Sequence, residues 1–125
     1  MPLFALDGSL DWNLVSREEL TLNDLGVIAP RIYTLSSSNI VVGTGINSGS
    51  PNWKWAGRLI QIVPSKPSST GIFGAGTEVS RTSLYIGRYQ HFRLADYAPR
   101  PYQIRFEPAR WLIDLTIEIW RYDDD

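Results

Sequence analysis

Hydrophobic and polar residues alternate strictly along the segment from Arg110 to Tyr122, near the C-terminal end of the chain. The odd positions hold Trp111, Ile113, Leu115, Ile117 and Ile119, and the even positions hold Leu112, Asp114, Thr116, Glu118 and Trp120. A two-residue period is that of a β-strand, whereas the 3.6-residue period of a helix would scatter the odd positions around its axis. We therefore predict a long, half-buried strand whose odd face lies in the core and whose even face points mostly toward water.

Weaker segments of the same kind come before it. Alternating or β-branched runs occupy residues 10–14, 27–35, 39–46, 53–63, 79–89, 90–94 and 102–106, and the segments between them are rich in Gly, Pro and Ser. Pro30 favours a strand start or an edge position, Gly57 favours a bulge, and Gly87 favours a break between two strands. About eight short strands predict an all-β fold, either an antiparallel β-sandwich of jelly-roll type or a barrel.

One segment also fits a helix. Ser16 to Glu19 match a capping box and Gly26 stands where a C-terminal cap would stand, so residues 17–25 could form a two-turn helix. Leu20 and Leu22 also keep the two-residue period, which leaves a strand as the alternative.

The length of 125 residues suits one domain with one core. We predict a single β domain over residues 1–125, with an N-terminal arm over about residues 1–8 and a short acidic C-terminal tail over residues 123–125. The arm is too apolar to remain in water, so it is expected to dock on this chain's own core or on a partner. The sequence shows neither a membrane span nor a signal peptide, and a virion or cytoplasmic location is expected.

Composition argues against several kinds of chemistry. The chain has no cysteine and one histidine, His91, which excludes disulfides, thiol nucleophiles and metal sites built on several Cys or His residues. Asp114 and Glu118 would lie about 13 Å apart on one strand face, too far for a glycosidase pair, and are expected to face solvent. His91 is expected to be structural, and the Gly-rich segment 71–76 lacks the Lys-Ser/Thr of a P-loop. We predict no catalytic site, no metal and no cofactor.

Charge is unevenly distributed although the net charge is only −1. Residues 1–30 carry a net charge of −4, residues 31–80 carry +3, residues 81–110 carry +4 and residues 111–125 carry −4. Most of the basic residues are Arg, which suits stacking and bidentate contacts at interfaces. A basic middle with acidic ends is expected of a subunit that binds copies of itself, because each copy offers its neighbour the opposite sign.

Aromatic residues suggest an alternative. Trp53 and Trp55 share a strand parity and lie about 7 Å apart, so they either pack in the core or form a platform for sugar rings or bases. Trp120 falls on the polar parity of the last strand beside Arg121, where an exposed indole would anchor a subunit interface. A carbohydrate-binding module that uses these tryptophans is the alternative function.

The stretch 81–110 interleaves six arginines with aromatic residues, a mixture that also suits single-stranded nucleic acid. Alternation sends neighbouring arginines to different faces and the isoelectric point is near 5.8, so nucleic acid ranks below a protein partner. The candidate interface or ligand residues are Phe4, Trp53, Trp55, Arg88, Tyr89, Arg93, Trp120 and Arg121. We expect a non-catalytic, homo-oligomeric structural subunit of a larger assembly, of the kind represented by capsid-decoration, neck or tail proteins of bacteriophages.

Overall fold

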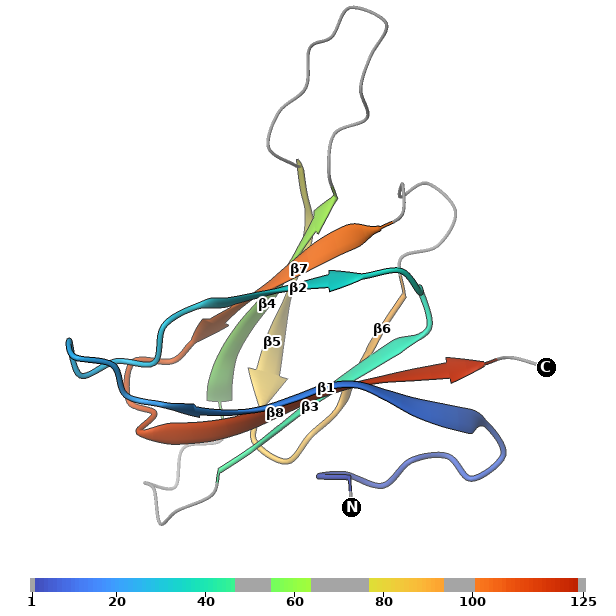
Figure 1. Ribbon diagram of the computed structural model, residues 1–125, viewed down its shortest axis with the longest axis horizontal. Coiled ribbons are helices and arrows are strands. Elements are labelled where there is room, and N and C mark those ends of the chain that lie inside the picture. The colour runs from blue at the N-terminus through green and yellow to red at the C-terminus, as the bar shows by residue number, and fades with distance from the viewer. Residues whose placement is uncertain (1, 47–54, 64–76, 94–100, 124–125) are drawn as a thin grey trace, which may run out of the picture.

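The computed structural model describes residues 2–46, 55–63, 77–93 and 101–123, which form two antiparallel sheets of four strands (Figure 1). The strands are β1 (Asp11–Thr21), β2 (Arg31–Leu35), β3 (Ile40–Gly45), β4 (Trp55–Val63), β5 (Thr77–Tyr85), β6 (Gln90–Phe92), β7 (Tyr102–Pro108) and β8 (Asp114–Asp123). The first sheet has the order β1-β8-β3-β6 and the second has the order β2-β7-β4-β5. The predicted β-sandwich is confirmed, and the barrel is wrong because the two sheets do not join into one closed sheet.

The strand order is that of a jelly roll. β1 pairs with β8, β2 with β7, β3 with β6 and β4 with β5, so the chain forms one long double ribbon that is rolled up. The pairs β3–β8 and β4–β7 join the ribbon into the two sheets. As a result, β1 and β6 are the edges of the first sheet, and β2 and β5 are the edges of the second.

The core lies between the sheets and is built from the inward positions of both. On β8 the odd residues Leu115, Ile117 and Ile119 are fully buried, as the alternation predicts. Leu59, Ile104 and Phe106 on β4 and β7 belong to the same core cluster. Burial of each such side chain contributes about 1.5–3 kcal/mol relative to exposure.

Two expectations about the last strand are corrected. Its even face does not point mostly toward water, because Thr116 and Glu118 are buried. The strand also starts at Asp114, after a turn, so Leu112 enters the core while Ile113 remains 46% exposed. Alternation is therefore informative only within the paired part of the strand.

The short helix over residues 17–25 is wrong. β1 continues to Thr21 and pairs with β8 along its whole length, apart from a bulge between Leu14 and Ser16. A helix of two turns has a costly nucleus and few internal hydrogen bonds, whereas pairing with β8 satisfies the backbone and places Leu20 in the core. Among the described residues there is no helix.

Gly57 and Pro30 behave as the sequence predicts. β4 has a register shift between Trp55 and Gly57, and Gly57 has a positive φ of 146°. A Cβ there would lie 3.0 Å from Cα of Pro108 and closer still to the carbonyl oxygen of Glu107, so only glycine lets β4 approach β7 at this point. Pro30 directly precedes β2, which is an edge strand.

Candidate functional site

The N-terminal arm lies on the outer face of the first sheet (Figure 1). Phe4 is buried and packs directly over Gly43 of β3, where a Cβ would lie 2.9 Å from Cζ of Phe4 and closer still to two other ring carbons. The arm cluster comprises Phe4, Val41 and Tyr122, with Leu3, Leu6, Leu10, Trp12 and Trp120 packed against them. The arm docks on its own sheet, which is one of the two outcomes that its apolar sequence predicts.

Glu118 ties the arm to the sheet. Its carboxylate is 1% exposed and accepts hydrogen bonds from the backbone N–H of Leu3 at 2.8 Å and from Nε1 of Trp120 at 3.1 Å. It also forms an ion pair with the guanidinium of Arg17 on β1. The expectation of a solvent-facing Glu118 is therefore wrong, and this carboxylate holds three segments of the chain together.

A cavity of about 370 Å³, which we call the arm cavity, opens between the arm and the first sheet. It is lined by Ala5, Leu6, Asp7, Leu10, Trp12, Val41, Tyr89, His91 and Tyr122. His91 is hydrogen-bonded through Nε2 to the hydroxyl of Tyr122, and the two rings are 5.4 Å apart. His91 lines this cavity together with Asp7.

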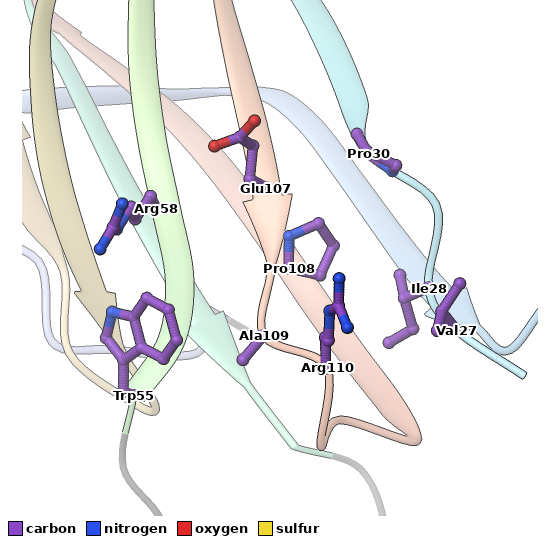
Figure 2. A pocket seen from close by; sticks show the side chains of 9 residues that line it. All are labelled: Val27, Ile28, Pro30, Trp55, Arg58, Glu107, Pro108, Ala109 and Arg110. Atoms are coloured by element: carbon purple, nitrogen blue, oxygen red, sulfur yellow. The ribbon is translucent and has the colours of Figure 1, made fainter.

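A second cavity of about 720 Å³, which we call the end cavity, lies where the β1–β2 and β7–β8 connections meet the start of β4. Figure 2 shows Trp55 and Arg58 on β4 at one side, Val27, Ile28 and Pro30 at the other, and Pro108 and Arg110 between them. Arg58 and Glu107 are cross-strand partners. Trp55 is half-buried, and the guanidinium carbon of Arg58 lies 5.9 Å from the centre of its ring. The Arg58 guanidinium therefore lies within cation–π range of the indole.

The most exposed large apolar side chain among the described residues is Leu25, at 85%. It lies at the tip of the β1–β2 turn, which is held by Asn23. Oδ1 of Asn23 accepts hydrogen bonds from the N–H groups of Leu25 and Val27, at 2.9 and 3.2 Å. The backbone N–H of Asn23 donates to the carbonyl of Val27 at 2.8 Å, and Gly26 completes the turn with a φ of 76°. Leu25 is thus presented to solvent on an ordered turn.

The predicted site residues are distributed over several surfaces. Phe4, Tyr89 and Trp120 all lie at the arm: Tyr89 stacks on Phe4 with a centroid distance of 5.4 Å, and Trp120 is half-buried in the arm cluster. Trp55 lies in the end cavity on the other sheet.

The predicted basic residues lie apart from the end cavity. Arg88 and Arg93 are exposed on either side of β6. Arg121 lies on β8, with Nε 3.9 Å from a carboxylate oxygen of Asp123. Trp53 and the Gly-rich segment 71–76 lie outside the described residues.

Two features of the site could not be found from the alternation pattern. Leu25 and Asn23 lie in a segment that also fits a helix, and the end cavity combines three segments that are distant in sequence. Within the part of the chain that the structure describes, no group of three or more His, Asp or Glu side chains could hold a metal ion, and no helix could span a membrane.

Comparison with known proteins gives no relative. No family model, no curated protein and no solved structure matches this chain significantly.

Proposed function

We propose that this chain is a non-catalytic structural subunit that associates with copies of itself in a larger protein assembly. The observation that carries the proposal is Leu25, 85% exposed at the tip of a hydrogen-bonded turn. Leu22 and Val27 beside it are exposed as well. Contiguous exposed apolar side chains mark interaction surfaces, and an anchor that is already ordered loses little conformational entropy on binding. We call Leu22, Leu25 and Val27 the apolar turn.

The free energy gained by burying Leu25 is large enough for an interface anchor. Burying an exposed leucine contributes about 1.5–3 kcal/mol, which is comparable with the cost of truncating an interface hot spot. Asn23 keeps the turn in place through its hydrogen bonds, so most of this gain is available for association.

The charge distribution supports a second copy as the partner. Asp11 and Glu19 are exposed on β1, and Asp24 is exposed on the turn that follows it. Arg88 and Arg93 are exposed beside β6, which is the opposite edge of the same sheet. Because the β1 edge is negatively charged and the β6 edge is positively charged, head-to-tail contact between copies is favoured and contact between identical edges is disfavoured.

The setting that we propose is a bacteriophage virion. Jelly-roll domains occur in viral capsid proteins, and this topology supports the setting by analogy of fold alone. The same architecture occurs in lectin domains, so the analogy does not by itself separate a structural subunit from a carbohydrate-binding module. Leu25 favours the subunit, because an exposed leucine on an ordered turn suits a protein partner better than a sugar.

The experiment is a mass measurement by light scattering over a concentration series, made for the wild type, Leu25→Ser and Ile32→Ser. Ile32 is the control because it is an exposed aliphatic residue on β2, outside the apolar turn and outside both charged edges of the first sheet. We expect the wild type and Ile32→Ser to form a discrete oligomer and Leu25→Ser to shift toward the monomer. A wild type that keeps a monomer's mass at every concentration would overturn self-association. An oligomeric Leu25→Ser would exclude the apolar turn as its anchor.

A further inference from the structure

Several aromatic rings line the arm cavity, and two pairs of them are tilted against each other. The rings of Trp12 and Tyr122 are 5.2 Å apart and tilted by 56°, and those of His91 and Tyr122 are tilted by 41°. Tyr89, which is 50% exposed, lines the cavity with them. The rings of Trp12, Tyr122 and His91 are therefore tilted against one another and do not form a flat stack.

An interaction of its own holds each of these rings in place. Nε1 of Trp12 donates a hydrogen bond to the backbone carbonyl of Asp7 at 2.7 Å, and the hydroxyl of Tyr122 is hydrogen-bonded to Nε2 of His91. Tyr89 is stacked on Phe4, which is itself fixed over Gly43. The cavity is therefore ordered before any ligand arrives, which reduces the entropy cost of binding.

The one carboxylate in the lining belongs to Asp7. The hydroxyl and the backbone N–H of Ser9 donate hydrogen bonds to its Oδ1 at 2.7 and 2.9 Å. These two bonds hold the pKa of Asp7 below its usual value, so the group is ionised at neutral pH. Neither lysine nor arginine lines the cavity, and its only fixed full charge is negative.

We propose that the arm cavity binds a compact organic monocation, with a quaternary ammonium or guanidinium head, among Trp12, Tyr89 and Tyr122 and beside Asp7. The faces of indole and phenol rings are negative and attract a cation within about 6 Å of the ring centre. The volume of about 370 Å³ is at the small end of ligand sites, which suits a head group rather than an extended chain. The aliphatic part of the lining, Ala5, Leu6, Leu10 and Val41, accommodates the apolar part of such a cation.

The same chemistry disfavours other occupants. An anion would meet the Asp7 carboxylate and the negative faces of the rings. The apolar turn of a second copy carries Asp24 next to Leu25, which would bring two carboxylates together at the mouth of the cavity. The apolar turn of a second copy is therefore not the expected occupant of the arm cavity.

The experiment is a titration of the full chain with choline and with dimethylbutanol, its neutral isostere, followed by the indole N–H signal of Trp12 and the ring signals of His91 in NMR spectra. We expect choline to shift these signals at concentrations about tenfold lower than dimethylbutanol does. Equal affinity for the two probes would overturn the requirement for a positive charge, and a lack of shifts with choline and with N-acetylarginine amide would overturn the site.

Two pairs of measurements sharpen the result. Tyr89→Leu should weaken choline binding about fivefold, whereas Tyr85→Leu, which changes an exposed tyrosine outside the cavity, should leave it unchanged. Asp7→Asn should weaken choline and leave dimethylbutanol unaffected, and an equal effect on both probes would contradict the role of the carboxylate.

A third titration, with N-acetylarginine amide, which is a monocation and has no free α-amino group, separates the two sources of such a cation. Tighter binding of N-acetylarginine amide than of choline identifies the occupant as an arginine of a protein partner. The reverse order identifies it as a free quaternary ammonium compound, and either order supports the cation site.

Discussion

Phe4 and Gly43 interlock, because the ring of Phe4 occupies the space in which any other residue at position 43 would carry its Cβ. This contact joins the N-terminal arm to the middle of the first sheet. Tyr89, which directly precedes β6, stacks on the same Phe4 ring. The arm is thus part of the folded domain, and the cavity beside it exists only while the arm is docked.

Gly43→Ala should release the arm. The new methyl group cannot share the site with the Phe4 ring, and overpacking of this kind costs about 1–3 kcal/mol. Urea unfolding measures the loss, and combination with Phe4→Ala tests its cause, since the two changes should be less than additive if they break the same contact. Gly8→Ala is the control, because a Cβ at Gly8 meets nothing within 4 Å. Full additivity would contradict the interlock.

Arg17→Gln should destabilise the protein because it leaves the buried Glu118 without its cation. A hydrogen bond to a charged group contributes about 1.5–3 kcal/mol, and Arg17 itself is partly exposed, so we expect a loss of about 1–2 kcal/mol. The double variant Arg17→Gln/Glu118→Gln should recover part of that loss, because no unpaired charge remains.

The pair Arg31–Glu18 provides the comparison for this prediction. Both of its side chains are more exposed than Glu118, and Arg31→Gln should cost less than about 1 kcal/mol. If chemical unfolding gives equal losses for Arg17→Gln and Arg31→Gln, the buried carboxylate has no special role.

Tyr33 should reduce stability at alkaline pH. Burial raises the pKa of its phenol well above the usual value, and the nearby Glu18 carboxylate raises it further. Above about pH 10 the phenol ionises in the unfolded chain but stays neutral in the folded one, so the unfolded state binds fewer protons and the free energy of unfolding falls as the pH rises. Between pH 8 and about pH 11, the free energy of unfolding, measured by urea unfolding at each pH, should therefore fall less steeply for Tyr33→Phe than for the wild type. Parallel curves would exclude Tyr33 as the cause.

Gly57→Ala should be among the most damaging small substitutions in the chain. It combines a positive φ with a clash against the backbone of Glu107, which cannot rotate away as a side chain can, so we expect a loss of about 3 kcal/mol or more. Gly87→Ala is the comparison without a clash, because Gly87 has open space around it and a φ of 69°, in the left-handed region where backbone strain costs about 1–2 kcal/mol. Equal thermal destabilisation of both variants would show that the contact between β4 and β7 adds nothing.

Much of the fold follows from local sequence. The two-residue period of Leu115, Ile117 and Ile119 determines a strand and its inner face, because side chains of a strand alternate between its two faces whatever the rest of the chain does. Pro30 and Gly57 determine an edge strand and a bulge for equally local reasons, namely a missing N–H and a permitted positive φ. No residue at the candidate surfaces has such a local signature. In the sequence, nothing distinguishes Leu25 from the other apolar residues of a segment that also fits a helix.

The sequence by itself therefore determined the all-β class, the strands of the sandwich and the apolar character of the arm. Tertiary structure decided the order of the strands, the burial of Glu118 and the two cavities. Glu118 stands on the polar side of its strand and is buried because Leu3, 115 residues away, lies over it. Alternation describes the two faces of one strand, but the environment of the outer face depends on which distant segment covers it.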